Sequence, residues 1–250
     1  MIYWLSDNPL APFPPVSQAL IEPNGLLAAG GDLEPQRLIN AYRHGIFAWY
    51  SENQPILWWS PDPRCILSCD AFHMSRRLRR ELKRSPVTLT TNTDFAAVIN
   101  GCAQGRRGEG GTWIVSEMRD AYLRLHELGY AHSIEVWCGD DLVGGIYGVL
   151  LGSMFYAESM FTRGHSGSKI ALLCLCRILA ARGVHCIDCQ LSSGHIMRLG
   201  ATEIPRDDFL SLMWRQLQQP LLNGWPQELP AVADLRQPLA TIDPGLDRSG

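Results

Sequence analysis

Two short segments carry side chains that could perform acid–base chemistry. Residues 155–161 read FYAESMF and residues 187–190 read IDCQ, so each apolar run reaches an acid or an amide at its end. Because an ionised carboxylate is costly to bury unpaired, strands that reach Glu158 and Asp188 are expected to open onto a site. A glycine-containing loop at 163–167 and a helix separate the two strands. This order predicts that Glu158, the loop and Asp188 lie near one another at the edge of a sheet.

The strongest concentration of charge is a basic segment, SRRLRRELKR at 75–84, which holds six of the 22 Lys and Arg residues. In a helix, residues four positions apart share a face, and Leu78 and Leu82 would attach the opposite face to the protein. A solvated helix face is one interpretation, but such faces usually intersperse acids, and only Glu81 does so here. We therefore favour a surface that contacts nucleic-acid phosphates. Its members are Arg76, Arg77, Arg80, Lys83 and Arg84.

Composition limits the classes of protein to which the chain can belong. Its 250 residues are 46% hydrophobic and 19% charged, which suits a folded protein of one large domain or two modest ones. The net charge of −3 gives no general sign of nucleic-acid binding. The longest apolar run is far shorter than the ~20 residues of a membrane span, and the start lacks a signal peptide. We therefore expect a cytoplasmic protein without a membrane partner.

The eight cysteines do not indicate a disulfide framework or a metal site. Four of them, Cys174, Cys176, Cys186 and Cys189, fall in a predicted helix and a predicted strand, where reduced thiols act as small hydrophobes. Cys186 and Cys189 form the only CxxC, and a structural zinc site usually needs a second pair of ligands at similar spacing. We therefore expect no metal.

Residues 1–62 are dense in proline and aromatic side chains and are predicted to form a small α+β lobe. Pro35 in a first turn and Gly45 after a last turn bound a helix within it. The proline-rich segment at 60–63 is a natural break but too short for a free linker, so the lobe is expected to pack against a domain at 63–222. From residue 223 onward, Pro, Asp and small residues predict a poorly ordered tail.

The domain that begins at residue 63 has a mixed α/β pattern. Its main predicted elements, in chain order, are a strand at 87–90, a helix at 116–129, strands at 133–138, 142–150 and 154–159, a long apolar helix at 168–183 and a strand at 184–190. Helix, three antiparallel strands, helix and strand is the order of an acyl-CoA N-acetyltransferase-like core. We therefore predict an α/β (α+β) fold that combines this core with the small N-terminal lobe.

Many blocks of the chain, in one order, resemble the leucyl/phenylalanyl-tRNA–protein transferases, bacterial enzymes that extend certain protein N-termini. The resemblance runs from about Tyr3 to Phe209. Its blocks are NGLLAAGGDL at 24–33, YRHGIFAWY at 42–50, WWSPDPR at 58–64, TWI at 112–114, AHSIE at 131–135, ESMF at 158–161, Ser168 with Lys169, IDCQ at 187–190, and His195. The fold of that family is an acetyltransferase-like core with a small N-terminal lobe, which agrees with the pattern of elements.

The resemblance implies an aminoacyltransferase that moves Leu or Phe, and sometimes Met, from aminoacyl-tRNA to the α-amine of proteins that begin with Arg or Lys. This addition would mark the acceptors for N-end-rule degradation. Because the aminoacyl ester is already activated, no metal or other cofactor is implied. Asp188 and Gln190 match the family's catalytic pair, and Glu158 matches a supporting acid. Asp188 would either take a proton from the amine or only position it, and the family suggests a monomer.

The resemblance also assigns binding positions. Those for the aminoacyl side chain are Ile146, Phe155, Ala157, Leu172, Leu179 and Ile187. All six could equally be ordinary core residues. Those for the 3′-terminal adenosine of the tRNA are Tyr42, Trp49, Trp113 and Tyr122. Stacking on a base would contribute ~1–3 kcal/mol, and packing between the lobes is the alternative role.

Two other functions compete with this interpretation. An acyl-CoA-dependent N-acetyltransferase would use the same core, but its phosphate loop needs a glycine where this chain has Ser166 and a second small position at Ser168. The register therefore fails, although the helix N-terminus could still hold a phosphate. A non-catalytic tRNA-binding module would explain the basic segment but would leave Glu158, Asp188 and Gln190 without a task.

Overall fold

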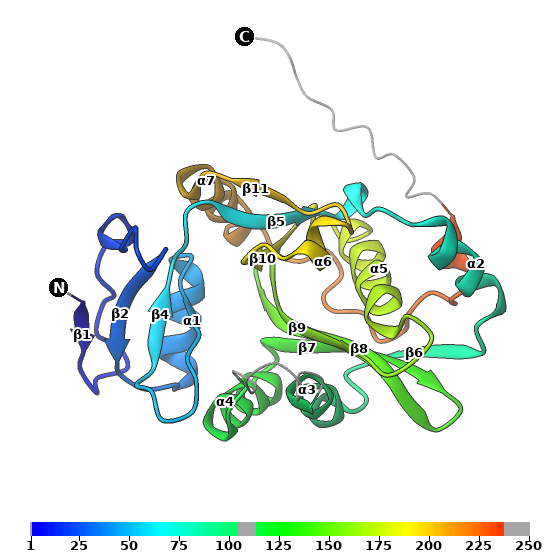
Figure 1. The fold of residues 1–250 in the computed structure, drawn as a ribbon, viewed down its shortest axis with the longest axis horizontal. Coiled ribbons are helices and arrows are strands. Elements are labelled where there is room, and N and C mark those ends of the chain that lie inside the picture. The colour runs from blue at the N-terminus through cyan, green and yellow to red at the C-terminus, as the bar shows by residue number, and fades with distance from the viewer. Residues whose placement is uncertain (1, 105–113, 238–250) are drawn as a thin grey trace, which may run out of the picture.

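The computed structural model describes residues 2–104 and 114–237, which fold around a small and a large β-sheet (Figure 1). The elements of the N-terminal part are β1 (Tyr3–Leu5), the 3₁₀ helix η1 (Val16–Gln18), β2 (Leu26–Gly30), α1 (Pro35–Arg43), β3 (Phe47–Ala48) and β4 (Leu57–Trp59). Their strands form a sheet with the order β1-β2-β4-β3, in which β1 is parallel to β2 and the other pairs are antiparallel.

The rest of the chain forms the large sheet and its helices. Its elements are β5 (Arg64–Ser68), the 3₁₀ helix η2 (Cys69–Ala71), α2 (Arg76–Arg84), β6 (Val87–Thr91), α3 (Phe95–Gln104), α4 (Ser116–Glu127), β7 (Ala131–Cys138), β8 (Asp141–Leu151), β9 (Met154–Thr162), α5 (Gly167–Ala180), β10 (Cys186–Gln190), α6 (Gly194–Met197), β11 (Thr202–Ile204), α7 (Arg206–Leu217) and the 3₁₀ helix η3 (Asp234–Arg236). The strand order is β11-β5-β10-β9-β8-β7-β6. This mixed α/β architecture with a small N-terminal sheet confirms the predicted fold class.

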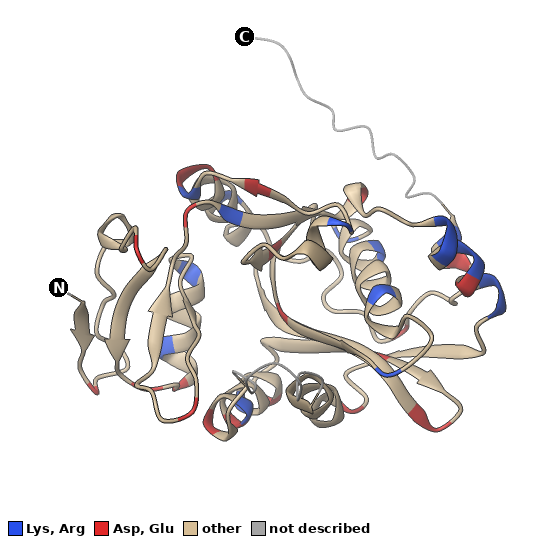
Figure 2. Ribbon diagram, in the orientation of Figure 1, with Lys and Arg blue, Asp and Glu red and all other residues tan. Residues whose placement is uncertain are grey.

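Helices cover both faces of the large sheet (Figure 1). The apolar side chains of α3, α4, α1 and α7 share one buried cluster with one face of the strands. Those of α5 and α2, with the segment after α7, share a second cluster with the opposite face. Helix α2 lies far from the N-terminal sheet and carries a concentration of Lys and Arg (Figure 2). No helix within the described ranges is long and apolar enough to cross a membrane.

Helix α1 forms where its sequence predicts it. Pro35 occupies the first turn, and Gly45 follows the last turn with a φ of +70°, the left-handed conformation that commonly ends a helix. Leu38, Ala41 and Tyr42 are its buried apolar face. This face packs toward the large sheet, where the Tyr42 hydroxyl donates to Glu158 Oε1 over 2.8 Å.

The two central strands of the large sheet, β9 and β10, pair in parallel over only two positions. Phe155 is opposite Ile187 and Tyr156 is opposite Asp188. Beyond this point β9 continues along β8, whereas β10 follows β5 through a β-bulge between Asp188 and Gln190. The strands therefore diverge, and the residues that follow on both strands line an opening between them.

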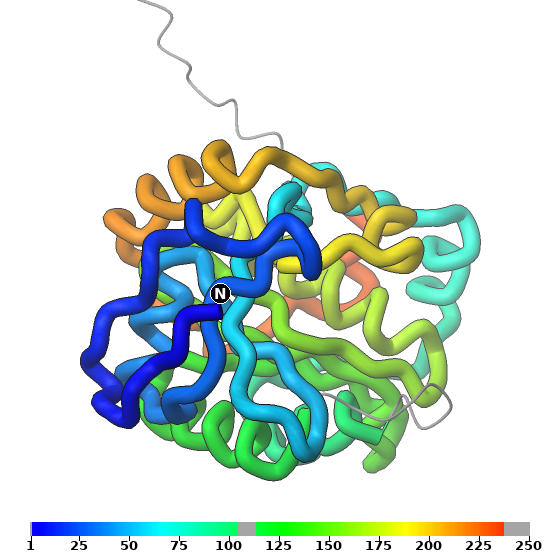
Figure 3. Tube along the Cα trace, turned by 60° about the vertical axis from the view of Figure 1, so that its left-hand side comes forward, coloured from blue at the N-terminus to red at the C-terminus, as the bar shows by residue number. Residues whose placement is uncertain are grey.

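Helix α7 connects the N-terminal part to the large sheet. It contacts both α1 and β9, and Figure 3 shows it beside the N-terminal segments. At its start, the Arg206 guanidinium donates to the Ser60 carbonyl over 2.8 Å, and the Arg206 backbone N–H donates to Asp62 Oδ1 over 3.1 Å. The break at 60–63 is thus held against the rest of the protein. The division into lobes at residue 62 stays a prediction.

The segment after residue 223 differs from the predicted poorly ordered tail as far as Gln237. The Trp225 ring stacks on His132 with ring centroids 4.1 Å apart, and its Nε1 donates to Thr91 Oγ1 over 2.8 Å. Leu235 is 1% exposed in the cluster beneath α5. These two apolar anchors order a segment whose overall composition resembles a tail. Residues 238–250 lie outside the described residues.

Candidate active site

A cavity of about 440 Å³ opens where β9 and β10 diverge. Its apolar lining consists of Phe47, Ala48, Trp49, Ile146, Ala157, Met160, Phe161, Leu172, Leu191 and Ile196. Its polar lining consists of Glu158, Ser159, Thr162, Ser168, Cys189, Gln190, Ser192, Ser193 and His195. Such a cavity can hold an apolar group beside reacting polar atoms. Among the described residues, no group of three or more His, Cys, Asp or Glu side chains is placed to hold a metal ion.

Glu158 is the acid of this cavity, and three donors hold its carboxyl group. The Tyr42 hydroxyl and the Gln190 amide each donate to Oε1 over 2.8 Å, and the Tyr122 hydroxyl donates to Oε2 over 2.5 Å. Burial raises the pKa of Glu158 to about 7, the charge of Asp188 adds to the rise, and the three hydrogen bonds oppose it. The carboxyl group can therefore both take up and release a proton near neutral pH.

Tyr42 and Tyr122 are buried hydrogen-bond donors to Glu158, and their predicted contact with the adenosine stays a prediction. Their hydroxyl oxygens are 2.8 Å apart, and both residues are at most 1% exposed. Burial, and then the nearby Glu158 carboxylate, raise the pKa of each phenol well above its usual value. Both phenols therefore keep their protons at physiological pH and remain fixed donors to Glu158.

Asp188, the other predicted acid, lies behind the cavity rather than on its surface. Its carboxylate is buried and forms a two-point ion pair with Arg64, with 2.9 Å between Oδ1 and Nε and 2.7 Å between Oδ2 and Nη2. Oδ1 also accepts the backbone N–H of Gln190 over 2.9 Å. The structure thus brings Glu158, Asp188 and Gln190 together, but only Glu158 and Gln190 reach the cavity.

The predicted aminoacyl positions divide into two groups. The three that line the cavity are Ile146, Ala157 and Leu172. The three that do not are Phe155, Leu179 and Ile187, each at most 1% exposed in the apolar cluster that α5 shares with the sheet. Phe155 and Ile187 are neighbours in the register of β9 and β10, before the two strands diverge. For these three residues the structure shows core packing, and their place in the aminoacyl pocket stays a prediction.

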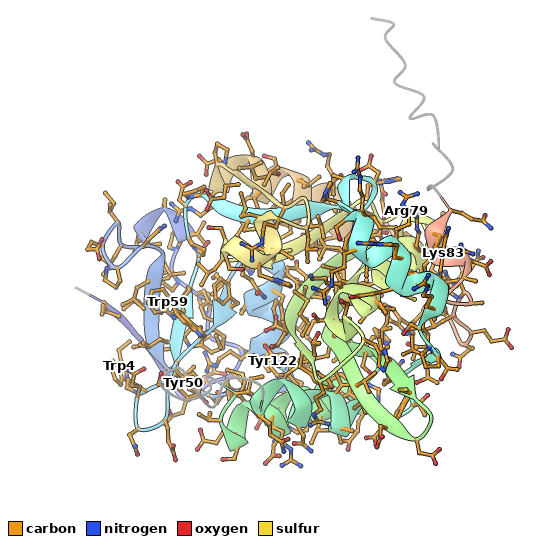
Figure 4. The ribbon with its side chains drawn as sticks, turned by 45° about the vertical axis from the view of Figure 1, so that its right-hand side comes forward. Trp4, Tyr50, Trp59, Arg79, Lys83 and Tyr122 are labelled. Carbon is orange, nitrogen blue, oxygen red and sulfur yellow. The ribbon has the colours of Figure 1, made fainter. Side chains whose placement is uncertain are left out.

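One predicted adenosine contact remains available at the cavity. Trp49 lines the cavity, is 40% exposed and packs edge-on against Trp59 with ring centroids 5.6 Å apart. The Trp59 Nε1 donates to the Trp49 carbonyl over 2.7 Å, which fixes the local backbone. Figure 4 shows Trp59 in the N-terminal part and Tyr122 in a helix beneath the large sheet. Trp113, the remaining prediction, lies outside the described residues.

The basic segment forms α2, and its predicted phosphate contacts point into solvent. Arg76, Arg77, Arg80, Lys83 and Arg84 are all exposed. Leu78 and Leu82 are buried as predicted, and the Ser75 hydroxyl caps the helix by accepting the Leu78 N–H over 3.1 Å. Glu81 pairs with Arg77 over 2.9 Å and also accepts from the Ser166 hydroxyl. The contact with Ser166 attaches α2 to the loop before α5, and Ser168 in the first turn of α5 lines the cavity. Figure 4 labels Arg79 and Lys83 of α2.

Arg64 is a site residue to which the sequence analysis assigns no role. It lies in the WWSPDPR block and opens the buried strand β5. A charged side chain at the start of a buried strand requires a buried partner, so the sequence could have indicated that Arg64 forms an ion pair. The sequence could not identify the partner, because Asp188 follows 124 residues later in the chain.

The strand order and the cavity between two diverging parallel strands define an acetyltransferase-like transferase core, extended at its N-terminus by a second sheet. The chain belongs to the leucyl/phenylalanyl-tRNA–protein transferase family. Residues 66–214 match the family described as leucyl/phenylalanyl-tRNA protein transferase, and residues 31–62 match the N-terminal domain of the same family.

Curated relatives are similar over most of their length. The leucyl/phenylalanyl-tRNA–protein transferase of Xanthomonas campestris pv. campestris (strain B100) is 53% identical, over 89% of this chain and 90% of the relative. That of Xylella fastidiosa (strain M23) is 55% identical over 87% and 90%, and that of Pseudomonas fluorescens (strain SBW25) is 50% identical over 90% and 99%. The crystal structure of FemX is a distant likeness, with a TM-score of 0.45 and 12% identity over 71% of this chain and 70% of that chain.

The buried state of Glu158 predicts how Glu158→Gln changes stability with pH. Because the folded pKa of about 7 lies above the ordinary 4.5, the parent protein loses stability as the pH rises through this window. Gln keeps the shape and does not ionise, and the tyrosine hydroxyls can accept from its amide. Relative to the parent, we expect the free energy of unfolding of the variant to increase across the window by at most about 3 kcal/mol, since Glu158 lines the cavity and is only partly buried.

Urea unfolding at a series of pH values measures this difference. Glu127→Gln, at the exposed end of α4, is the control for removing a surface carboxyl group. A stability difference between Glu158→Gln and the parent that is the same at every pH would contradict the raised pKa.

Proposed function

We propose that this chain transfers Leu or Phe, and sometimes Met, from aminoacyl-tRNA to the α-amine of proteins that begin with Arg or Lys. The observation that carries the proposal is Glu158, a carboxyl group with a pKa of about 7 that is held by Gln190 in a largely apolar cavity. Transfer from an activated ester needs a proton acceptor near neutral pH and a held amine. The chain would act as a cytoplasmic monomer that marks its acceptors for N-end-rule degradation.

In the proposed reaction, the acceptor nitrogen attacks the carbonyl carbon of the aminoacyl ester. A C–N bond forms, and the bond from the carbonyl carbon to the ribose oxygen breaks. Glu158 takes the proton that the nitrogen loses and returns it to the ribose oxygen as it leaves, so the proton count balances. The Gln190 amide, 2.8 Å from Glu158, is placed to orient the amine. Tyr42 and Tyr122 hold the carboxyl group and keep their own protons.

The proposed substrate positions follow the polarity of the lining. The side chain of Leu or Phe would occupy the apolar part formed by Ile146, Ala157 and Leu172. Trp49, which is partly exposed, offers an aromatic face to the terminal adenosine. The phosphates that precede the adenosine would extend toward α2, since α2 is attached to the loop that begins α5.

Charge supports the proposed preference for an N-terminal Arg or Lys. Arg64 neutralises Asp188 behind the cavity. Among the described residues that line the cavity, Glu158 is the acid that remains to attract a cation. Ser159, Ser192 and Ser193 add neutral oxygen atoms that can accept from an ammonium or a guanidinium group.

The geometry gives less support to an acyl-CoA-dependent acetyltransferase. The backbone N–H of Ser168 at the start of α5 already donates to Thr162 Oγ1 over 2.8 Å. The same turn lies against β8 so closely that a Cβ built on Gly167 would be 2.6 Å from the Gly144 Cα. A pyrophosphate would have to compete for N–H groups that are partly occupied and closely packed.

The direct test offers the protein both kinds of donor. Labelled Leu-tRNA or labelled acetyl-CoA is incubated with a peptide that begins with Arg and with a matched peptide that begins with Ala. We expect labelled Leu on the Arg peptide alone and no acetylation. Acetylation without leucylation would replace the proposal by an acetyltransferase, and tRNA binding without either product would replace it by a binding module.

The exposed arginines of α2 are expected to bind tRNA phosphates. The triple variant Arg76→Ala, Arg80→Ala and Arg84→Ala should weaken tRNA binding and reduce the slope of its salt dependence by ~2, because fewer counterions are released. Turnover at saturating tRNA should change little, since none of the three lines the cavity. Binding titrations at several salt concentrations measure the slope. An unchanged slope, or an equal loss with Arg215→Ala on the surface of α7, would contradict this role.

The volume at Ala157 is expected to decide which donors fit. Ala157 lines the cavity and follows Tyr156, the last residue of β9 that pairs with β10. In the series Ala157→Ser, Ala157→Val and Ala157→Phe, transfer should fall with increasing volume, and the Phe donor should be lost before the Leu donor. Binding of tRNA should be unchanged throughout, and Ala157→Ser is the size-matched control. Normal Phe transfer by a folded Ala157→Phe variant would show that Ala157 does not contact the donor.

A further inference from the structure

Arg64 is a fully buried charged residue that takes no part in the proposed proton transfers. Besides its two-point pair with Asp188, its Nη1 donates to the carbonyl oxygen of Gly45 over 3.0 Å. The rings of Phe47 and Phe209 lie against it, with centroids 4.9 Å and 4.6 Å from the guanidinium carbon. A planar cation with donors in a fork is the group that satisfies these partners together, and a lysine ammonium is not.

The Asp188 carboxylate is occupied by partners within the protein and does not line the cavity. Both of its oxygens bind the Arg64 guanidinium, and Oδ1 also accepts the Gln190 backbone N–H. The residue is 0% exposed and does not line the cavity. Its contacts therefore lead from Arg64 to the backbone of Gln190 and not to an acceptor amine.

Gln190 has a backbone conformation that residues with a side chain seldom adopt. Its φ is +58°, in the left-handed region, at the bulge where β10 leaves its regular pairing with β5. The hydrogen bond from its N–H to Asp188 Oδ1 stabilises this conformation. In this backbone conformation, the Gln190 side-chain amide donates to Glu158 Oε1 over 2.8 Å.

We propose that Arg64 is a positioning residue for aminoacyl transfer. Arg64 fixes Asp188, Asp188 fixes the left-handed backbone of Gln190, and the Gln190 amide is thereby directed at Glu158 and the acceptor amine. Asp188 is then an anchor and not a proton carrier. This role rests on the proposed function of Glu158 and Gln190. Because Gly45 and Phe47 belong to the N-terminal part, the direction of the amide also depends on how that part packs.

A double-variant cycle of Arg64→Lys and Gln190→Ala tests this series of contacts. Lysine keeps a positive charge beside Asp188 but cannot form the fork, so Gln190 loses its fixed direction. We expect Arg64→Lys to lower the turnover of transfer by a factor on the order of 10². The KM for aminoacyl-tRNA should change little, and in the Gln190→Ala background Arg64→Lys should cause no further loss. Defects that multiply as independent factors would overturn the proposal.

Arg37 provides a matched control for a buried arginine. It is also 0% exposed, pairs with Asp32 over 2.9 Å, and does not line the cavity. Arg37→Lys should lower stability, but any effect on transfer should be the same in the parent and in the Gln190→Ala background. If Arg37→Lys and Gln190→Ala also lowered turnover non-additively, the effect of Arg64 on transfer would reflect a general structural role and not positioning.

A second readout does not require activity. The Gln190 amide is one of the donors that lower the pKa of Glu158, so losing its direction should raise that pKa. NMR titration of isotope-labelled glutamate carboxyl groups should give the same increase for Arg64→Lys, Gln190→Ala and the double variant. If this holds while the parent transfers neither Leu nor Phe, the proposed function fails and the positioning role stands. An unchanged Glu158 pKa in Arg64→Lys would overturn the positioning role.

A second pair of substitutions keeps the test decisive if Arg64→Lys does not fold. Arg64→Met with Asp188→Leu replaces the buried ion pair by apolar groups of similar size, an exchange that folded proteins often tolerate. The double variant should remain folded by circular dichroism and lose turnover. Turnover is the readout here, because removing the Asp188 charge also lowers the pKa of Glu158. Normal turnover in this folded variant would overturn the proposal.

Discussion

The site depends on the divergence of two parallel strands. β9 and β10 pair only between Phe155 and Ile187 and between Tyr156 and Asp188, and each then follows its other neighbour in the sheet. If the pairing continued, the two strands would stay about 4.8 Å apart, and their side chains would close over the position of the cavity. The bulge in β10 turns that strand toward β5, so the opening forms while β10 stays paired with β5 and β9 stays paired with β8. Glu158 and Gln190, each two residues beyond the last pair, face each other across the opening.

Two carboxyl groups at this divergence have different partners, and the partners decide what each can do. Asp188 is bound by a guanidinium group, and a buried charge needs such a partner. Glu158 is bound by two phenols and an amide, all of them neutral, so burial dominates and its pKa rises to about 7. Neutral donors keep the carboxyl group oriented without fixing its charge. Glu158 can therefore gain and lose a proton in place, which is what a reaction with one proton acceptor and one leaving oxygen requires.

The order of elements could be predicted from the sequence because the strands and helices of the large sheet keep clear apolar faces. Acids and amides at the ends of apolar runs indicated Glu158 and Gln190 for a similar reason. The wall of the cavity could not be predicted in the same way. Phe155 and Ala157 share a face of β9, but one precedes the divergence and the other follows it, so only Ala157 lines the cavity. The partners of Asp188 and Tyr42 were also hidden, because Arg64 and Glu158 lie 124 and 116 residues away from them in the chain.

Arg64 lies between the two segments that match the family, 31–62 and 66–214, and its partners belong to both. Gly45 and Phe47 come from the first segment, and Asp188 and Phe209 from the second. Stability alone does not account for such a residue, because apolar substitutes for a buried ion pair are often as stable. A planar fork accepts one arrangement of its partners, so it specifies a position for the N-terminal part relative to the bulge in β10. Phe47 itself lines the cavity, as does the neighbouring Trp49. The interaction that directs the Gln190 amide therefore also places the wall against which the substrate lies.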